Sequence, residues 1–289
     1  MTTHPRPLLI SLAGALVLSL AGLAALRGGA WWHSQGSAES NNLQDLLQQV
    51  SSQRASVPEA VAPPPPQQDR WVSPLSGSCP VLDGRLQQRL RQLRLRLNRS
   101  TALRRIDPSN YGKRYRLDAF GTPVDPTPRV IVLHETVYGL NSALNTFRTP
   151  HVEDDAQVSY HSLIGLNGEL VRVVDPLLRA FGAGYSAFNQ KWVITNPNVG
   201  GSINNFALHL SLETPQDGEN EQQEHSGYTE AQYDTLALEL ETWMRRFAIP
   251  VEHITTHRHV DLGGERADPR SFDWPRLATR LRALGLLCA

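Results

Sequence analysis

The stretch RVIVLHET, residues 129–136, decides how the rest of this sequence is interpreted. Apolar and β-branched residues run through it without a break up to one histidine, His134. Uninterrupted runs of this kind are typical of buried strands. The stretch therefore predicts a buried strand of a sheet, with His134 at its C-terminal end.

Strand and helix patterns alternate along the residues that follow. Residues 158–175, VSYHSLIGLNGELVRVVD, predict two strands around an Asn-Gly turn, the strongest short signal for a hairpin. Residues 204–214, NNFALHLSLET, alternate leucines with polar side chains as a strand does. Residues 228–250 and 272–286 predict helices, the first with a capping box and the second with a proline in its first turn. The alternation predicts an α/β domain, with a single mixed β-sheet flanked by helices.

Composition limits the class of protein. The chain has 289 residues, of which 40% are hydrophobic, and its 28 basic residues balance 28 acidic ones. These values are ordinary for a soluble globular protein with one good-sized domain and some appendages. Because the formal net charge is zero, no overall field favours nucleic acid or an anionic surface. We expect no nucleic-acid partner.

The first 74 residues have the composition of an export signal followed by a tether. Arg6 precedes an uncharged run, residues 7–26, that is long enough to cross ~30 Å of hydrocarbon as a helix. We interpret residues 1–30 as a signal anchor or, alternatively, as a cleaved signal peptide. Residues 31–74 are polar and contain four consecutive prolines, which predicts a disordered, Pro-rich linker. The remainder is then exported, in the periplasm or facing the cell wall, and held at the membrane if the N-terminal segment is uncleaved.

A basic amphipathic helix is predicted within residues 75–107, which lead into the main domain, residues 108–289. Six arginines lie between residues 85 and 99. Four leucines follow the spacing of one helical stripe: Leu86, Leu90, Leu93 and Leu97. Such a helix can lie on a membrane or on an anionic polymer. We favour the alternative that it packs its leucines on the domain and leaves a basic face in solvent.

The sequence contains two cysteines, Cys79 just before this helix and Cys288 at the penultimate position. In an exported protein an isolated pair favours a disulfide. The alternative is two unpaired thiols, one of them buried and the other at a frayed terminus.

The stretch THRHVDLGGERADPRSFDW, residues 256–274, holds further candidates for chemistry and has almost no helical periodicity. Within it His257 is followed, eleven residues later, by Asp268. With His134 these side chains offer two imidazoles and a carboxylate, the ligand count of an open zinc site whose fourth position holds water. The structural alternative is a hydrogen-bonded histidine, the commoner role of this residue in an ordered domain.

Five motifs in order resemble those of the zinc-dependent N-acetylmuramoyl-L-alanine amidases of the type-2 amidase and peptidoglycan recognition protein superfamily: VIVLHET, SYHSLIGLNGELV, NNFALHLSLE, THRHVD and RADPRSFDW. The resemblance covers residues 129–281 and implies that family's fold and its Zn²⁺ cofactor. Carried over motif by motif, the metal ligands fall on His134, His257 and Asp268. His259 competes for the second place. His257 is preferred for its following residues. In the family the ligand is followed by one residue, then a polar residue and then an aliphatic one, and HRHV, residues 257–260, has this order.

The resemblance also implies roles around the metal. Tyr160 matches a tyrosine that donates to the reacting carbonyl in some relatives, and Arg266 matches a lysine that stabilises the oxyanion. Their structural alternatives are a hydroxyl anchored in the sheet and a surface cation. Ser211 stands where bacterial cytosolic members carry a general-base glutamate, as serine does in the recognition-protein branch, and Gly182 replaces a histidine that contacts the sugar-peptide. By strand alternation Glu213 faces the same way as Ser211, so it is an acid/base candidate or a solvated carboxylate.

The resemblance implies a peptidoglycan hydrolase that cleaves the amide bond between N-acetylmuramic acid and L-alanine with a zinc-activated water. Peptidoglycan or a muropeptide is then the partner, which the export signal and the tether favour independently. Two alternatives are a module that binds muropeptides without cleaving them and a structural wall-anchoring protein. The three ligands count against the first, and the second leaves His134 and residues 256–274 without a purpose.

Overall fold

The computed structural model describes residues 61–101 and 103–288. The segment interpreted as a signal anchor or signal peptide, residues 1–30, lies outside these residues, as does most of the predicted linker. Within the described residues, no helix is both long and apolar enough to cross a membrane.

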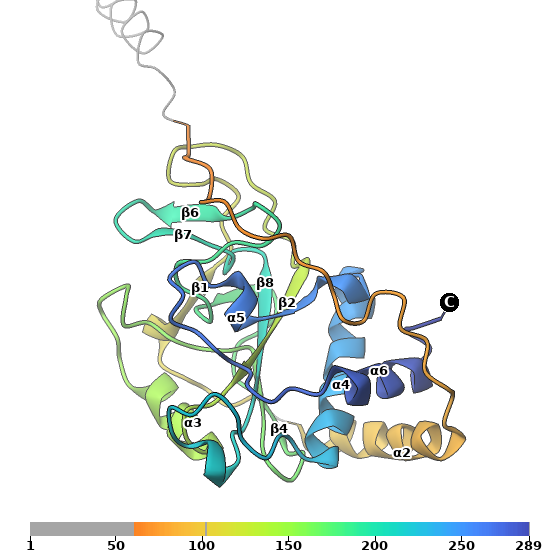
Figure 1. Cartoon of the computed structure of the whole chain (residues 1–289). Coiled ribbons are helices and arrows are strands. Elements are labelled where there is room, and N and C mark those ends of the chain that lie inside the picture. Colours follow the sequence, from red (N-terminus) through yellow and green to blue (C-terminus); the bar gives the residue numbers. More distant parts are fainter. Residues whose placement is uncertain (1–60, 102, 289) are drawn as a thin grey trace, which may run out of the picture. The chain divides into compact units, whose positions relative to one another are not determined.

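In the described part of the chain, five strands form the central sheet, in the order β4-β3-β8-β2-β9 (Figure 1). β2 pairs in parallel with β8 and with β9, and β8 also pairs in parallel with β3. β3 and β4 form the antiparallel hairpin predicted around the Asn-Gly turn. The bounds are β2 Val130–Glu135, β3 Ser162–Ile164, β4 Leu170–Arg172, β8 Ala207–Leu212 and β9 Ile254–Thr256. The predicted mixed sheet is confirmed.

The other elements surround this sheet. Two antiparallel pairs are β1 (Tyr111–Lys113) with β5 (Leu178–Ala180), and β6 (Val193–Asn196) with β7 (Gly200–Ser202). The α-helices are α2 Gly84–Ser100, α3 Leu140–Arg148, α4 Glu230–Phe247, α5 His257–Val260 and α6 Trp274–Ala283. The 3-10 helices are η1 Pro108–Asn110, η2 Gln216–Gly218 and η3 Val251–His253. Helices α2, α4 and α6 lie on one side of the sheet and α3 lies on the other (Figure 1).

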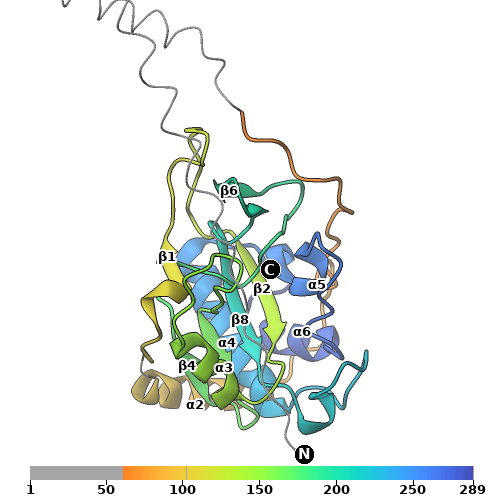
Figure 2. The same cartoon turned by 90° about the vertical axis from the view of Figure 1, so that its left-hand side faces the viewer.

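The two faces of β2 bury different side chains. Ile131 and Leu133 point to the face covered by α4 and α6, where they join the main hydrophobic core. Val132 and His134 point to the opposite face, because successive side chains of a strand alternate. Figure 2 shows β2 and β8 side by side, with α5 next to β2. His134 therefore lies on the face of the sheet away from α4 and α6.

The predicted start of α4 and the predicted hairpin pack against each other. Thr229 and Gln232 form the capping box: the Gln232 main-chain N–H donates to the Thr229 hydroxyl at 3.1 Å, and the Gln232 side chain accepts from the Thr229 N–H. In the hairpin, Gly168 has φ +76°, and a Cβ there would lie 2.7 Å from the carbonyl oxygen of Ala231. The glycine is thus required both by the turn and by its contact with the first turn of α4.

Helix α2 packs its leucines on the domain, which confirms the favoured alternative. Leu86 and Leu90 are buried in a cluster with Leu238 of α4. Arg89, beside this stripe, forms an ion pair with Asp234 of α4 at 2.7 Å. The leucine stripe is therefore part of the core.

Residues 61–74, which composition assigns to a disordered linker, lie against the domain without regular secondary structure. The ring of Trp71 packs on His259 with 4.6 Å between centroids, and its Nε1 donates to a main-chain carbonyl at 3.0 Å. Trp192 donates in the same way to the carbonyl of Pro63 at 2.9 Å. A Pro-rich segment makes few hydrogen bonds of its own, so its carbonyls can accept from the domain. Composition could not reveal these contacts, because the partner of each lies far away along the chain.

Cys79 and Cys288 are joined in a disulfide, which confirms the pairing that the sequence favoured. Neither of the described cysteines is free. The bond ties the segment before α2 to the residues after α6.

The disulfide should stabilise the domain, because it joins residues 209 positions apart and restricts the unfolded chain. Replacing both cysteines with serine is expected to lower the free energy of unfolding by about 2–4 kcal/mol. Urea unfolding of the wild-type and the double variant measures the difference. Equal stability of the two proteins, or two free thiols in the unreduced protein by mass spectrometry, would contradict this.

Candidate functional site

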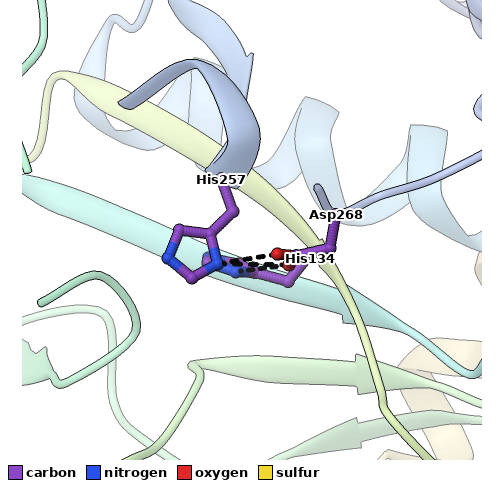
Figure 3. Close-up of side chains that lie close together, drawn as sticks. All are labelled: His134, His257 and Asp268. Atoms are coloured by element: carbon purple, nitrogen blue, oxygen red, sulfur yellow. Dashed lines mark hydrogen bonds and ion pairs between the residues drawn. The ribbon is translucent and has the colours of Figure 1, made fainter. Parts of the chain in front are cut away.

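Three side chains meet at the C-terminal end of β2: those of His134, His257 and Asp268. One potential ligand atom from each lies within 4.8 Å of the other two. The carboxylate faces both histidines, with Oδ2 3.3 Å from His134 Nδ1 and Oδ1 3.0 Å from His257 Nδ1 (Figure 3). Among residues 61–101 and 103–288, this is the one group of His, Cys, Asp or Glu side chains close enough to hold a metal ion.

Strand pairing places the two histidines side by side. β2 and β9 are parallel, with Leu133 opposite Thr256, so the next residues, His134 in β2 and His257 directly after β9, lie side by side at the C-terminal edge of the sheet. His257 is also the first residue of α5. The following loop returns Asp268 to this edge, where its carbonyl accepts a hydrogen bond at 2.9 Å from the main-chain N–H of the residue after His257. All three side chains are therefore positioned by main-chain contacts.

Glu135, the residue after His134, anchors the same loop from the other face of the sheet. Its buried carboxylate accepts hydrogen bonds from the Arg270 main-chain N–H at 3.1 Å and from the Arg270 guanidinium. The Tyr228 hydroxyl also donates to it, and His225 Nε2 lies 3.0 Å away. Two consecutive residues of β2 thus shape the site, one as a candidate ligand and one as the anchor of the loop.

The geometry of the group fits a tetrahedral metal site. Ligand atoms about 2.0–2.2 Å from a zinc ion lie about 3.3–3.6 Å apart in a tetrahedron. A single Asp268 oxygen, Oδ2, lies 3.3 Å from His134 Nδ1 and 3.2 Å from His257 Nδ1, close to these separations. His134 Nδ1 is buried and has no hydrogen-bond partner within the described chain, so its lone pair is available to an ion. Two imidazoles and one carboxylate leave the fourth position of such a site open to water.

Burial sets the protonation states of the group. Burial, and then the charge of His257, lowers the pKa of His134 to about 4, so this imidazole is neutral at neutral pH. Burial alone would raise the pKa of Asp268, but the two imidazoles that face the carboxylate outweigh it and hold that pKa below its usual value. A neutral imidazole and an ionised carboxylate are the forms that bind metal ions.

Tyr160 lies against this group, and Arg266 lies on the loop that carries Asp268. The Tyr160 ring stacks on His134 with 4.4 Å between centroids and meets Phe147 of α3 edge-on at 5.5 Å. Burial, and then the negative charge of Asp268, raises the pKa of Tyr160 above its usual value, so the hydroxyl keeps its proton. Arg266 is exposed on the loop, and its charge acts on both His134 and Tyr160.

Glu213 has a different environment from the one that strand alternation predicts. Its two carboxylate oxygens accept main-chain hydrogen bonds from Leu140, the first residue of α3, and from Leu166, in the turn after β3, each at 2.7 Å. Gly139 and Gly165 leave room for it, since a Cβ there would lie 3.1 and 3.2 Å from the carboxylate. Glu213 does not belong to the metal-binding group. In the structure Glu213 thus clamps the start of α3 to the hairpin turn, and its acid/base role stays a prediction.

His209 is a residue of the site to which the sequence analysis gave no role. Its ring is fully buried, with Nδ1 3.0 Å from His134 Nε2. Its position explains Gly182, because a Cβ there would lie 2.4 Å from the His209 ring, which leaves no room for a histidine. Ser211, opposite His134 in the strand register, is buried, and its hydroxyl has no partner among the described residues. The alternation of residues 204–214 put His209 on this face but could not name its partner.

His259, the competitor for the second imidazole, lies apart from the group. Its ring packs on Trp71, and its carbonyl accepts a hydrogen bond from the Gln68 side chain. The structure thus places His257, and not His259, beside His134 and Asp268.

Comparison with known families identifies the class of protein. Residues 124–271, just over half of the chain, match the N-acetylmuramoyl-L-alanine amidase family, and this segment contains His134, His257 and Asp268. No curated protein matches the sequence. The chain belongs to the N-acetylmuramoyl-L-alanine amidase family, and it is an amide hydrolase of that class.

Several solved amidase structures resemble this chain. A selenomethionine derivative of AmpD is 23% identical, with a TM-score of 0.46 over 62% of this chain and 93% of that one. AmpD from Citrobacter freundii is 24% identical, with a TM-score of 0.40 over 62% of this chain and 89% of that one. AmiD from E. coli, in complex with anhydro-N-acetylmuramic acid-L-Ala-D-gamma-Glu-L-Lys, is 22% identical, with a TM-score of 0.41 over 53% and 57%.

Metal content should distinguish the two neighbouring histidines of α5. His257→Ala is expected to lose the bound metal, because it removes one of three ligands, whereas His259→Ala should retain it. Elemental analysis of both purified variants after zinc loading and desalting measures this. The reverse ranking would show that the second ligand has been assigned to the wrong histidine.

The buried histidines should make the stability of the metal-free protein depend on pH. Burial lowers the pKa of His134 to about 4, that of His161 to about 3 and that of His209 well below its usual value of 6.5. Below pH 6.5 the unfolded chain therefore binds more protons than the folded chain, and stability falls as the pH falls. Each histidine contributes at most about 1.4 kcal/mol per pH unit.

Urea unfolding of chelator-treated protein between pH 7 and pH 5 measures this slope. The lowered pKa of Asp268 acts only below its ordinary value of 3.8, so it makes no contribution in that window. A stability that is constant or that rises on acidification would contradict the prediction.

Proposed function

We propose that the protein is a zinc-dependent peptidoglycan hydrolase that cleaves the amide bond between N-acetylmuramic acid and the L-alanine of the stem peptide. The observation that carries the proposal is the group of His134, His257 and Asp268, which lies in the segment that matches the amidase family. When bound there, zinc supplies a Lewis acid for the carbonyl and lowers the pKa of water to about 7.

The chain's own residues supply the remaining parts of the reaction. Tyr160 keeps its proton, because its pKa is raised, so it serves as a hydrogen-bond donor to the scissile carbonyl oxygen and not as a base. Arg266 is exposed on the loop that carries Asp268, and we assign to its positive charge the stabilisation of the developing oxyanion. A well-placed donor of this kind is typically worth about 3–4 kcal/mol of transition-state stabilisation. Asp268 remains ionised and provides the negative charge that a divalent ion requires.

Ser211 is the observation that favours the alternative function, a module that binds muropeptides without cleaving them. A serine hydroxyl is a far weaker base than a glutamate carboxylate. Within the described residues, Asp268 is the one carboxylate of the metal-binding group. An enzyme without a second carboxylate must move protons with the groups that remain, whereas a binding module has no such requirement.

The proposed partner is peptidoglycan or a muropeptide, and the proposed location is the periplasm or the outer side of the membrane facing the cell wall. The disulfide between Cys79 and Cys288 supports an oxidising compartment. Residues 7–26 have the composition of an export signal, and if they are uncleaved they anchor the protein in the membrane. Substrate and compartment agree, because peptidoglycan lies outside the cytoplasm.

Hydrolysis can be tested on purified peptidoglycan with the zinc-loaded full chain. We expect stem peptides with a new free L-alanine amino group, detected by amine labelling and mass spectrometry. A chelator should stop their release and added zinc should restore it. Asp268→Asn should abolish release, because it removes the charge that holds the ion, while muropeptides still bind.

Glu265→Gln is the matched control, since Glu265 is an exposed carboxylate on the same loop outside the group. It should release stem peptides at the wild-type rate. If zinc-loaded wild-type protein binds muropeptides but releases no new amino groups from walls of several stem chemistries, the binding module replaces the hydrolase.

A further inference from the structure

Both ring nitrogens of His134 contact another side chain, and one of these side chains, that of His209, has no assigned role. Its Nδ1 faces Asp268 at 3.3 Å, and its Nε2 lies 3.0 Å from His209 Nδ1. A neutral imidazole that offers the Nδ1 lone pair to a metal must carry its proton on Nε2. In that state Nε2 donates to His209 Nδ1, and the hydrogen bond fixes both the tautomer and the orientation of the His134 ring.

The His209 ring is itself held from several sides. It stacks on His161 with an interplanar angle of 11°, and the His209 main-chain N–H donates to His161 Nδ1 at 3.0 Å. Above the ring, residue 182 has no Cβ: one built there would lie 2.4 Å from Cγ and 2.5 Å from Nδ1. Gly182 therefore leaves space for the nitrogen that contacts His134.

Stability alone does not account for a histidine at this position. With Nδ1 accepting from His134, the proton of neutral His209 lies on Nε2, and this buried nitrogen has no hydrogen-bond partner among the described residues. A buried donor without a partner costs stability, which an apolar side chain of similar size would avoid. The contact with His134 is the feature that an apolar replacement would lose.

We propose that His209 is a positioning residue that holds His134 in the metal-ligating tautomer, with Gly182 providing the space. The inference rests on the proposed function, because it takes His134 to be a metal ligand. Hydrogen-bond partners of metal-bound histidines typically change metal affinity about 10- to 100-fold when removed. A change of that size is expected here without loss of the fold.

Two measurements on the full chain test the positioning role of His209. The first is zinc affinity, measured by competition with a chelating dye, and the second is the visible spectrum of the Co²⁺-loaded protein. In His209→Leu the side chain fills the same space but cannot accept a hydrogen bond from His134. This variant should lower zinc affinity about 10- to 100-fold and change the Co²⁺ absorption bands. His209→Asn places its side-chain oxygen near the position of Nδ1 and should restore affinity to within a few-fold of wild type. Rescue by asparagine is a result that a purely structural role would not give.

Two further variants complete the test. Gly182→Ala retains His209 but displaces its ring, so it should also lower zinc affinity. Thr255→Val is the matched control: Thr255 is buried in β9, its hydroxyl has no partner among the described residues, and it should bind zinc as wild type does. Circular dichroism and urea midpoints for each variant establish that the comparison is made between folded proteins.

The outcomes separate this inference from the proposed function. If wild type binds zinc tightly and His209→Leu binds it equally well, or if leucine and asparagine weaken it to the same extent, the positioning role is wrong while the zinc site stands. If wild type binds no zinc at all, the proposed function fails and this inference fails with it.

Discussion

The parallel pairing of β2 with β9 is the constraint on which the site depends. It sets Leu133 opposite Thr256, so that the following residues, His134 and His257, lie side by side at the C-terminal edge of the sheet. The register is fixed by burial, because Ile131 and Leu133 fill the core under α4 and α6. A slip of one residue would turn these side chains outward and direct His134 into that core. The apolar contacts that stabilise the sheet therefore also place the candidate ligands.

The same burial determines the electrostatics of the group. A fully buried His134 is neutral at neutral pH, and Asp268 is ionised because the histidines hold its pKa low. A buried negative charge beside two imidazoles is costly unless a cation compensates it. A divalent ion held there would supply that compensation and would also take the lone pair of His134 Nδ1, which otherwise has no hydrogen-bond partner within the described residues.

Local patterns predicted the framework and the candidate ligands. The uninterrupted apolar run before His134, the Asn-Gly hairpin and the capping box at Thr229 each depend on neighbouring residues, and the structure contains all three. The choice of His257 over His259 came from a resemblance in residue order, and the structure places His257 beside Asp268.

What the sequence did not reveal depends on contacts between distant segments. Glu213 was expected near the site by strand alternation, but its partners are the N–H groups of Leu140 and Leu166, which only the folded chain brings within reach. His209 faced the correct side of its strand, yet its contact with His134 follows from the pairing of β8 with β2. Trp71 belongs to a segment whose composition predicts disorder, and its partner lies in α5.

Zinc K-edge X-ray absorption of the metal-loaded protein tests the central claim, that His134, His257 and Asp268 hold the ion, most directly. The account predicts one zinc per chain with nitrogen and oxygen neighbours at about 2.0–2.2 Å, two of them showing the outer-shell scattering of imidazole. In His257→Ala, which should bind zinc weakly, the spectrum of any zinc that can still be loaded should show the scattering of one imidazole instead of two. A sulfur neighbour at about 2.3 Å, or an unchanged spectrum in that variant, would contradict it.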